Sequence, residues 1–299
     1  MAASIEHAPG ELVDVRGHRL WVEREGAGPT LLMLTALGPA GSHVHGHPWG
    51  RRLADAFDVV YVDLHGRGRS DHPADLTEID FAGDVADVAA LVERLGGPVS
   101  IYGFSYGGLV AQALALDHPT LVDRLVLANT LHGPEMWQAN HVNINAEIAR
   151  QDPERWARIL ALRGRGVRST DAEMAPEFAS AQPLVRFYDP GNAARLPSEP
   201  GSRNEALYRA FCGDDVDFII GGRIPAIPDF RPRLRDLAIP ALVLYGRYDR
   251  ALYPALQEPF RRIPDAQVVA LERSGAFGHI EEPDRVVEEV RRFLAAAGG

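Results

Sequence analysis

The chain has 299 residues, of which 46% are hydrophobic and 24% charged, and its formal net charge at pH 7 is −10. This length suits one globular domain or a core domain with an inserted subdomain. An acidic surface repels phosphate backbones, so we expect no nucleic-acid partner.

Nothing in the sequence predicts a membrane or secretory protein. No apolar run approaches the length of about 18 residues that a membrane span requires, and the N-terminus lacks a basic segment followed by an apolar one. Cys212 is the only cysteine, so no intrachain disulfide is possible, which fits a reducing compartment. We therefore expect a cytoplasmic protein without a membrane partner; the sequence leaves its oligomeric state open.

The N-terminal quarter of the chain predicts a hairpin and then a buried strand. Residues 11–15 and 20–24 alternate apolar and polar positions around a Gly-His turn, which predicts two antiparallel strands. Residues 30–34 form a short apolar run of the kind found in parallel strands that are buried on both faces. The loop that follows contains Gly38, whose N–H is a candidate donor to an oxyanion.

Three histidines, His43, His45 and His47, follow this loop with a spacing that suggests a metal site. They have no acidic or cysteine partner in the neighbouring sequence and lie among Gly and Pro residues, so we expect no metal there. The next predicted strand, residues 59–62, leads into a glycine-rich loop over residues 63–70. We interpret His65 and Arg67 in that loop as hydrogen-bonded structural residues.

A serine lies at a sharp turn between a predicted strand and a predicted helix. The amphipathic segment 79–95 predicts a helix that ends at two glycines, and residues 99–102 predict the strand that follows. Residues 103–107 read G-F-S-Y-G, and a helix begins at about residue 108. In this context the pattern predicts a nucleophile elbow with Ser105 at its tip. The N–H of Tyr106, at the start of the helix, is the second candidate oxyanion donor.

The order of elements changes after the predicted strand 125–128. Residues 131–235 contain predicted helices, such as 147–162, with no strands between them, and strands return at 241–245 and 267–271 before a closing helix at 286–294. We therefore expect an α/β core made of residues 1–130 and 236–299, with residues 131–235 inserted as a helical cap. Asp249 follows the strand 241–245, at the same end of the sheet as Ser105, where it would orient a histidine base.

These segments resemble the proline iminopeptidase-like branch of the α/β-hydrolases, which includes amino-acid amidases. The family patterns H-G-G-P-G-x-S, D-x-R-G-x-G-R-S and G-x-S-x-G-G are similar to residues 36–42, 63–70 and 103–108, and residues 177–181, 207–213 and 239–249 resemble its cap helices and its segment ending in the triad Asp. The resemblance implies an α/β-hydrolase fold with a mostly parallel central sheet flanked by helices, and a serine hydrolase that needs no cofactor.

The chain departs from the family in the groups expected to contact substrate. The family's His-Gly pair is Ala36-Leu37 here, which changes the oxyanion loop and places Leu37 at the substrate site. Asp217 falls where the family has a Glu that helps to hold the substrate's α-amino group. The resemblance therefore favours a small-molecule amide or ester as substrate over strict peptide-bond specificity.

The third departure concerns the catalytic base. The family segment S-G-H-F-P-x-x-E-E-P corresponds without gaps to residues 274–283, which places Ala276 at the expected His position and His279 three residues further on. In one account Ala276 replaces a natural His, as in a variant made to trap a substrate complex, and the chain is nearly inactive. In the other, His279 has taken the role, although three residues of extended chain span about 10 Å.

Three functions remain open at this point. The first is a serine hydrolase that cleaves a small amide or ester through an acyl-enzyme on Ser105. The second is a lyase, cyclase or acyltransferase with the same fold, as the changed oxyanion loop suggests. The third is a variant without a base that binds its ligand without turnover.

Overall fold

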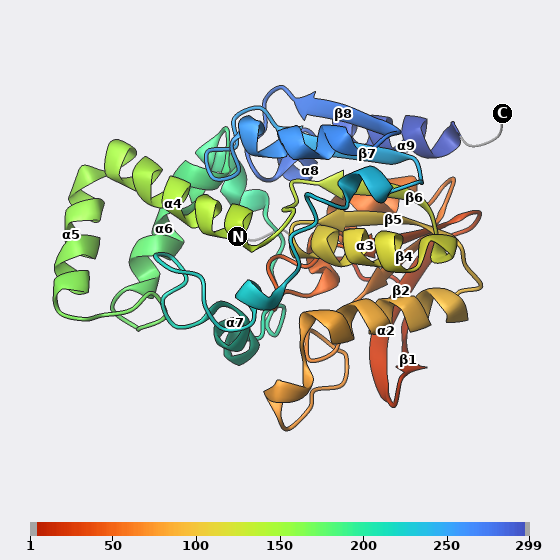
Figure 1. Ribbon diagram of the computed structural model, residues 1–299, viewed down its shortest axis with the longest axis horizontal. Helices are drawn as coiled ribbons and strands as arrows, with labels where there is room; N and C mark the ends of the chain where they lie inside the picture. The colour runs from red at the N-terminus through yellow and green to blue at the C-terminus, as the bar shows by residue number, and fades with distance from the viewer. Residues whose placement is uncertain (1–4, 297–299) are drawn as a thin grey trace.

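The computed structural model describes residues 5–296, and Figure 1 shows helices on both sides of a central sheet. Within these residues eight strands form one sheet in the order β1-β2-β4-β3-β5-β6-β7-β8. The strands are β1 Gly10–Val15, β2 His18–Gly26, β3 Thr30–Leu34, β4 Asp58–Val62, β5 Val99–Phe104, β6 Val122–Ala128, β7 Ala241–Gly246 and β8 Ala266–Leu271. The helices are α1 His47–Gly50, α2 Phe81–Arg94, α3 Tyr106–Asp117, α4 Pro134–Gln151, α5 Pro153–Gly164, α6 Ala175–Arg186, α7 Glu205–Cys212, α8 Gly278–Glu281 and α9 Pro283–Ala295.

The sheet is antiparallel at one edge and parallel elsewhere. β2 pairs antiparallel with both β1 and β4, and all pairs from β4 to β8 are parallel. Successive residues of β3 point to opposite faces, with Leu32 and Leu34 in one apolar cluster and Leu31 and Met33 in the other. Both faces are therefore buried, which explains the uninterrupted apolar runs. The predicted hairpin and mostly parallel sheet are confirmed.

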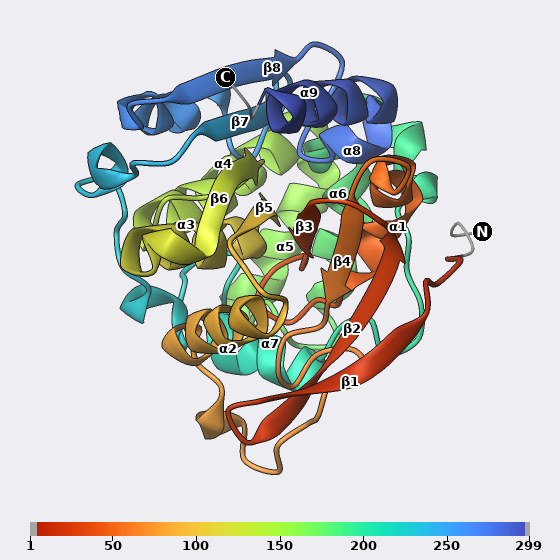
Figure 2. The same ribbon diagram turned by 90° about the vertical axis from the view of Figure 1, so that its right-hand side faces the viewer.

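Helices cover the two faces of the sheet. α2 and α3 lie on one face, while α1 and α9 lie on the other (Figure 2). α2 begins after Asp80, whose carboxylate accepts a hydrogen bond of 2.7 Å from the N–H of Gly83 and so caps the helix. The ends of these helices are thus set by local sequence, whereas their positions are set by the two apolar clusters.

The chain between β6 and β7 adds helices but no strand to the described sheet. α4, α5, α6 and α7 lie together beyond one end of the sheet, on the left in Figure 1. A third apolar cluster, which includes Ile144, Ile159 and Phe178, holds α4, α5 and α6 to one another, whereas the buried residues of α7 belong to a cluster of the core. The boundaries at residues 131 and 235 between core and cap remain our interpretation. None of the helices in residues 5–296, including α4 with its 18 residues, is apolar enough over a sufficient length to cross a membrane.

One predicted helix is wrong in its bounds. The sequence predicted a single helix over residues 147–162, but the chain turns at Asp152 between α4 and α5. Pro153 lacks an N–H and disfavours helical backbone in the residue before it, and Asp152 accordingly has φ −140° and ψ 72°. The carboxylate of Asp152 then caps α5 by accepting a hydrogen bond of 3.0 Å from the N–H of Arg155.

Candidate active site

Ser105 lies where the chain passes from β5 into α3. Its backbone has φ 51° and ψ −119°, a positive φ that residues with a side chain adopt rarely and at a cost in energy. The neighbouring chain supports this conformation, because Ser105 N–H donates to the Ala128 carbonyl at 3.2 Å and the Thr130 hydroxyl donates to the Ser105 carbonyl at 2.7 Å. Ser105 is partly exposed, at the carboxyl end of a central strand.

The glycines around Ser105 let the strand and the helix approach closely. A Cβ added to Gly107 would lie 1.9 Å from the carbonyl oxygen of Leu34, and one added to Gly103 would lie 2.7 Å from Cα of Gly108. Real Cβ atoms cannot approach backbone so closely, so only glycine fits at these two positions. The start of α3 is thereby held against the end of β3.

The two proposed oxyanion donors lie on these neighbouring segments. Tyr106 is the first residue of α3, so its N–H has no acceptor within the helix. Gly38 lies four residues after the end of β3 and has φ 69°, which glycine adopts without strain. A Cβ on Gly38 would lie 3.8 Å from the ring of Tyr208 on α7, so the inserted helices approach this loop.

A buried ion pair joins the two segments that carry these donors. The Arg67 guanidinium contacts both carboxylate oxygens of Asp84 at 2.7 Å, and its Nε–H donates to the Pro39 carbonyl at 2.9 Å. The hydroxyl of Tyr106 donates to the same carboxylate at 2.6 Å. Burial and the charge of Asp84 raise the pKa of Tyr106 well above its ordinary value, so this hydroxyl keeps its proton. Arg67 is therefore a hydrogen-bonded structural residue, as its place in the glycine-rich loop predicted.

Asp249 is a buried carboxylate in the loop after β7. Its Oδ1 accepts hydrogen bonds of 2.8 Å from the N–H groups of Ala251 and Leu252, and its Oδ2 accepts one of 2.9 Å from the Asn129 amide. Burial raises the pKa of the Asp249 carboxyl, whereas the Arg186 guanidinium and these hydrogen bonds oppose the shift. The carboxylate is thus held in one orientation by Asn129, directly after β6, and by two N–H groups of its own loop.

Ala276 lies in the loop after β8, which packs against the loop of Asp249. The N–H of Tyr248 donates to the Ser274 carbonyl at 2.9 Å, and a Cβ on Gly246 would lie 1.9 Å from the Gly275 carbonyl oxygen. The N–H of Ala276 donates to the carbonyl of Arg186 at 2.7 Å, which attaches this loop to the end of α6. The side chain of Ala276 is buried.

His279 has an aromatic environment. Its ring centroid is 4.7 Å from that of Phe104 and 6.0 Å from that of Trp49. Burial, with a smaller contribution from His45, lowers the pKa of His279 to about 3. Its Nε2 is buried without a hydrogen-bond partner, and within residues 5–296 no hydrogen bond joins it to Ser105 or to Asp249.

The two expected substrate contacts lie in different surroundings. Leu37 is partly buried and packs against the apolar cluster on the α9 side of the sheet. Asp217 belongs to the inserted segment, and its Oδ1 is 3.3 Å from Nδ1 of His141 on α4. His141 was not expected near this site from the sequence.

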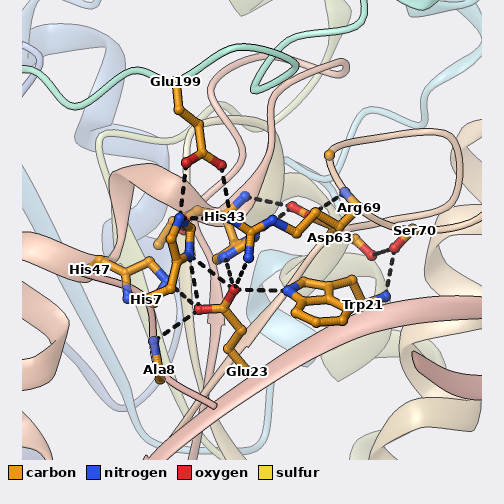
Figure 3. A network of polar contacts seen from close by, with 12 residues as sticks. His7, Ala8, Trp21, Glu23, His43, His47, Asp63, Arg69, Ser70 and Glu199 are labelled. Atoms are coloured by element: carbon orange, nitrogen blue, oxygen red, sulfur yellow. Dashed lines mark hydrogen bonds and ion pairs between the residues drawn. The ribbon is translucent and has the colours of Figure 1, made fainter. Parts of the chain in front are cut away.

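The histidines after β3 are not isolated from acidic groups. His43 and His47 lie around the buried carboxylate of Glu23 on β2, together with His7 (Figure 3). The reason given above for excluding a metal, the lack of an acidic partner, is therefore wrong, because the partner comes from a strand 20 residues earlier in the chain. His45 is buried outside this group, and burial lowers the pKa of its imidazole to about 4.

The comparison with known families agrees with the sheet order and with the turn at Ser105. The model of the alpha/beta hydrolase family matches residues 43–289, which is most of the chain. The chain belongs to the alpha/beta hydrolase family. The match runs from the histidine segment after β3 to the closing helix α9, so it includes the elbow, the inserted helices and the loops of Asp249 and Ala276.

Individual hydrolases are similar over nearly the whole length. The chain is 24% identical to a proline iminopeptidase of Saccharolobus solfataricus, covering 86% of this chain and 82% of that protein. It is 26% identical to a pimeloyl-acyl-carrier-protein methyl ester esterase of Aeromonas hydrophila, covering 91% of this chain and 98% of that protein. The crystal structure of a proline iminopeptidase of Mycobacterium smegmatis superposes with a TM-score of 0.80 at 21% identity, over 96% of this chain and 98% of that one. These likenesses support a hydrolase in general and do not select one kind of bond.

Sequence reasoning did not find the residues that hold the candidate groups in place. Asn129 bonds to Asp249 from 120 residues away, and Asp84 contacts the elbow from the first turn of α2. A weak signal existed for Asp84, because it is a carboxylate near the start of an otherwise apolar helix face. For Asn129 the only signal was its place directly after a buried strand.

The buried state of His279 predicts a measurable dependence of stability on pH. Because its pKa is about 3 in the folded chain and about 6.5 when unfolded, only the unfolded chain binds the proton between these values, and stability falls as pH drops through this window. In His279→Leu the stability lost between about pH 7.5 and about pH 4.5 should be smaller by about 3 kcal/mol, measured by denaturant unfolding at each pH. The exposed His118→Leu variant is the control, and an equal change in both variants would contradict the assignment.

Proposed function

We propose that this chain has the machinery of a serine hydrolase that cleaves a small amide or ester through an acyl-enzyme on Ser105. The observation that carries the proposal is the strained backbone of Ser105, with φ 51°, at the junction of β5 and α3. Strain of this kind persists only where the surroundings enforce it, and it is common at reactive positions. The flanking glycines and the hydrogen bonds from Thr130 and to Ala128 provide that enforcement.

The proposed chemistry follows from the groups around the serine. The Ser105 hydroxyl attacks the substrate carbonyl and gives its proton to a base, and the developing oxyanion accepts hydrogen bonds from the N–H groups of Gly38 and Tyr106. The alcohol or amine leaves with a proton, and water then releases the acyl group from Ser105. Asp249 would orient the base and stabilise its charged form.

The position of Ala276 fits the site of the base better than that of His279. Ala276 lies in the loop that packs against the loop of Asp249. His279 lies among Phe104, Trp49 and Phe277, and a base with a pKa of about 3 accepts a proton poorly near neutral pH. We therefore propose that the chain lacks its base and acylates slowly.

Restoring an imidazole tests this proposal. The variant Ala276→His should hydrolyse a panel of aminoacyl and simple acyl esters about 10²–10⁴-fold faster than the unmodified chain, the usual contribution of a general base. Ser105→Ala in the same background should remove this gain, and intact-mass spectrometry should detect the acyl group only when Ser105 is present.

Other outcomes separate the alternative functions. If the unmodified chain already has full activity and His279→Ala destroys it, then His279 is the base and our alignment is wrong. If Ala276→His turns substrate over without any acyl-enzyme, a lyase or cyclase mechanism is favoured. If neither form is acylated by esters or by a serine-directed phosphonate, the chain is a binding protein.

For the substrate side, we infer that Asp217 recognises a positively charged amino group. Its side chain is 16% exposed, and it belongs to the inserted segment that approaches the oxyanion loop through Tyr208. Within residues 5–296 the Asp217 carboxylate has one ionic contact, with His141, which leaves acceptor positions for a further donor. A substrate ammonium group would add a charge-assisted hydrogen bond there.

This assignment predicts a selective change in substrate preference. In the Ala276→His background, Asp217→Asn should raise KM for aminoacyl esters by about tenfold, the loss of one charge-assisted hydrogen bond, and leave esters without an amino group unchanged. Asp214→Asn removes an exposed carboxylate from the same acidic run and serves as the control. Equal effects of Asp217→Asn on both classes of ester would refute the role.

A further inference from the structure

A group of three imidazoles surrounds one buried carboxylate outside the candidate active site. Glu23 is fully buried on β2, and its oxygens lie 3.0 Å from Nδ1 of His7, 3.2 Å from Nε2 of His43 and 3.0 Å from Nε2 of His47. Figure 3 shows the three rings on one side of this carboxylate. One nitrogen from each ring and a Glu23 oxygen all lie within 4.8 Å of one another.

The hydrogen bonds of His43 orient its free nitrogen toward this group. Nδ1 of His43 is 2.7 Å from Asp63, whose carboxylate also accepts the backbone N–H of His43 at 2.8 Å. With its Nδ1–H donated to Asp63, a neutral His43 presents the lone pair of Nε2 to Glu23. Two acceptors would then face each other at 3.2 Å in a site that is 1% exposed, an arrangement that either a metal ion between them or a proton on Nε2 would stabilise.

His47 is a second buried imidazole whose ring nitrogens lack hydrogen-bond partners among the described residues. Its side chain is only 2% exposed. Burying an imidazole without satisfying either nitrogen is costly. Its Nε2 is nevertheless 3.0 Å from Glu23, as expected of two ligands of one ion.

The charges of the group are consistent with a divalent ion. Glu23, Glu199 and Asp63 contribute three negative charges, and Arg69, 3.1 Å from Glu23 and 3.6 Å from Glu199, contributes one positive charge. With neutral imidazoles, two negative charges remain uncompensated. Glu23 and Asp63 are fully buried, whereas Glu199 is 26% exposed, and one divalent cation would compensate the remaining charge.

The spacing also suits a tetrahedral ion. Nitrogen and carboxylate ligands bind zinc at about 2.0–2.2 Å, which places the corners of a tetrahedron about 3.3–3.5 Å apart. The contacts of 3.0–3.2 Å between Glu23 and the three imidazoles approach this separation. Asp63 on His43 and Glu199, 2.9 Å from Nε2 of His7, are the outer carboxylates that commonly orient ligating imidazoles.

We propose that Glu23, His7, His43 and His47 form a structural binding site for a divalent transition metal of the zinc class. Four protein ligands close the coordination sphere, which is characteristic of structural rather than catalytic zinc. The ion would join the N-terminal segment to β2 and to the chain after β3, which carries Gly38 a few residues upstream. Through His7 and Glu199 it would also attach the inserted segment to the core.

A second histidine group in the chain provides a matched comparison. His18, His65 and Asp87 also lie close together, but the two rings stack face to face with centroids 3.8 Å apart and an angle of 11°. Stacked rings direct their nitrogens outward in parallel and not toward one ion. We therefore expect no metal at this second group.

Metal titration of the full chain tests the proposal without reference to catalysis. Protein stripped with a chelator should bind one Zn²⁺ per chain, and Co²⁺ should give the intense visible absorption of a tetrahedral complex with nitrogen and oxygen ligands. Zinc should raise the midpoint of thermal unfolding by several degrees. Glu23→Gln and His47→Gln should lose the Co²⁺ band and the thermal shift, whereas His18→Gln should keep both.

Protons on the imidazoles are the alternative to a metal ion as the positive charge beside Glu23. The same metal titration distinguishes the two. If the network is closed by protonated imidazoles, Co²⁺ gives no band and Zn²⁺ leaves the unfolding midpoint unchanged, which would overturn the proposal. Binding that persists in Glu23→Gln or disappears in His18→Gln would place the ion elsewhere. Should Glu23→Gln fail to fold, His7→Gln, at a partly exposed ligand, must weaken Co²⁺ binding while leaving the circular dichroism spectrum unchanged.

Discussion

The candidate active site depends on the buried ion pair of Arg67 and Asp84. Both side chains are almost completely excluded from solvent, so removing one partner would leave an uncompensated charge at a cost of about 3–5 kcal/mol. Arg67 donates a hydrogen bond to the carbonyl of Pro39, the residue after Gly38. Asp84 accepts a hydrogen bond from the hydroxyl of Tyr106. The two N–H groups proposed for the oxyanion are therefore positioned from a single buried network, and the serine between β5 and α3 is placed beside them by glycines that admit no Cβ.

The fold was predictable because its signals are local or periodic. Apolar runs predicted the strands, and the chain belongs to the family that the turn at Ser105 suggested. The break at Pro153 was also local and was overlooked because the apolar positions continue across it. The supporting contacts were not predictable, since Asn129 contacts Asp249 from 120 residues away and Glu23 on β2 contacts His43 in the segment after β3. Such contacts depend on which strands lie side by side in the sheet. A single sequence does not show which distant residues this order brings together.

Within residues 5–296 no histidine forms a hydrogen bond with the carboxylate of Asp249. Asp249 accepts three hydrogen bonds and lies near Arg186, so the carboxylate is held without the imidazole that the proposed mechanism would use. His279 lies among aromatic rings, and its burial lowers the pKa and keeps the imidazole neutral. In the proposed mechanism, a nucleophile and an oxyanion site without a base would bind an ester and be acylated slowly. The proposed metal site is independent of this chemistry and acts on the segment that follows the oxyanion loop.

The central claim is that Ser105, Gly38 and Tyr106 form one reaction centre. It is tested most directly by the crystal structure of Ala276→His after treatment with a serine-directed phosphonate. The account predicts phosphorus bonded to Oγ of Ser105, with one phosphonyl oxygen accepting hydrogen bonds from the N–H groups of both Gly38 and Tyr106. Phosphorus on another residue, or a phosphonyl oxygen directed away from both N–H groups, would contradict it.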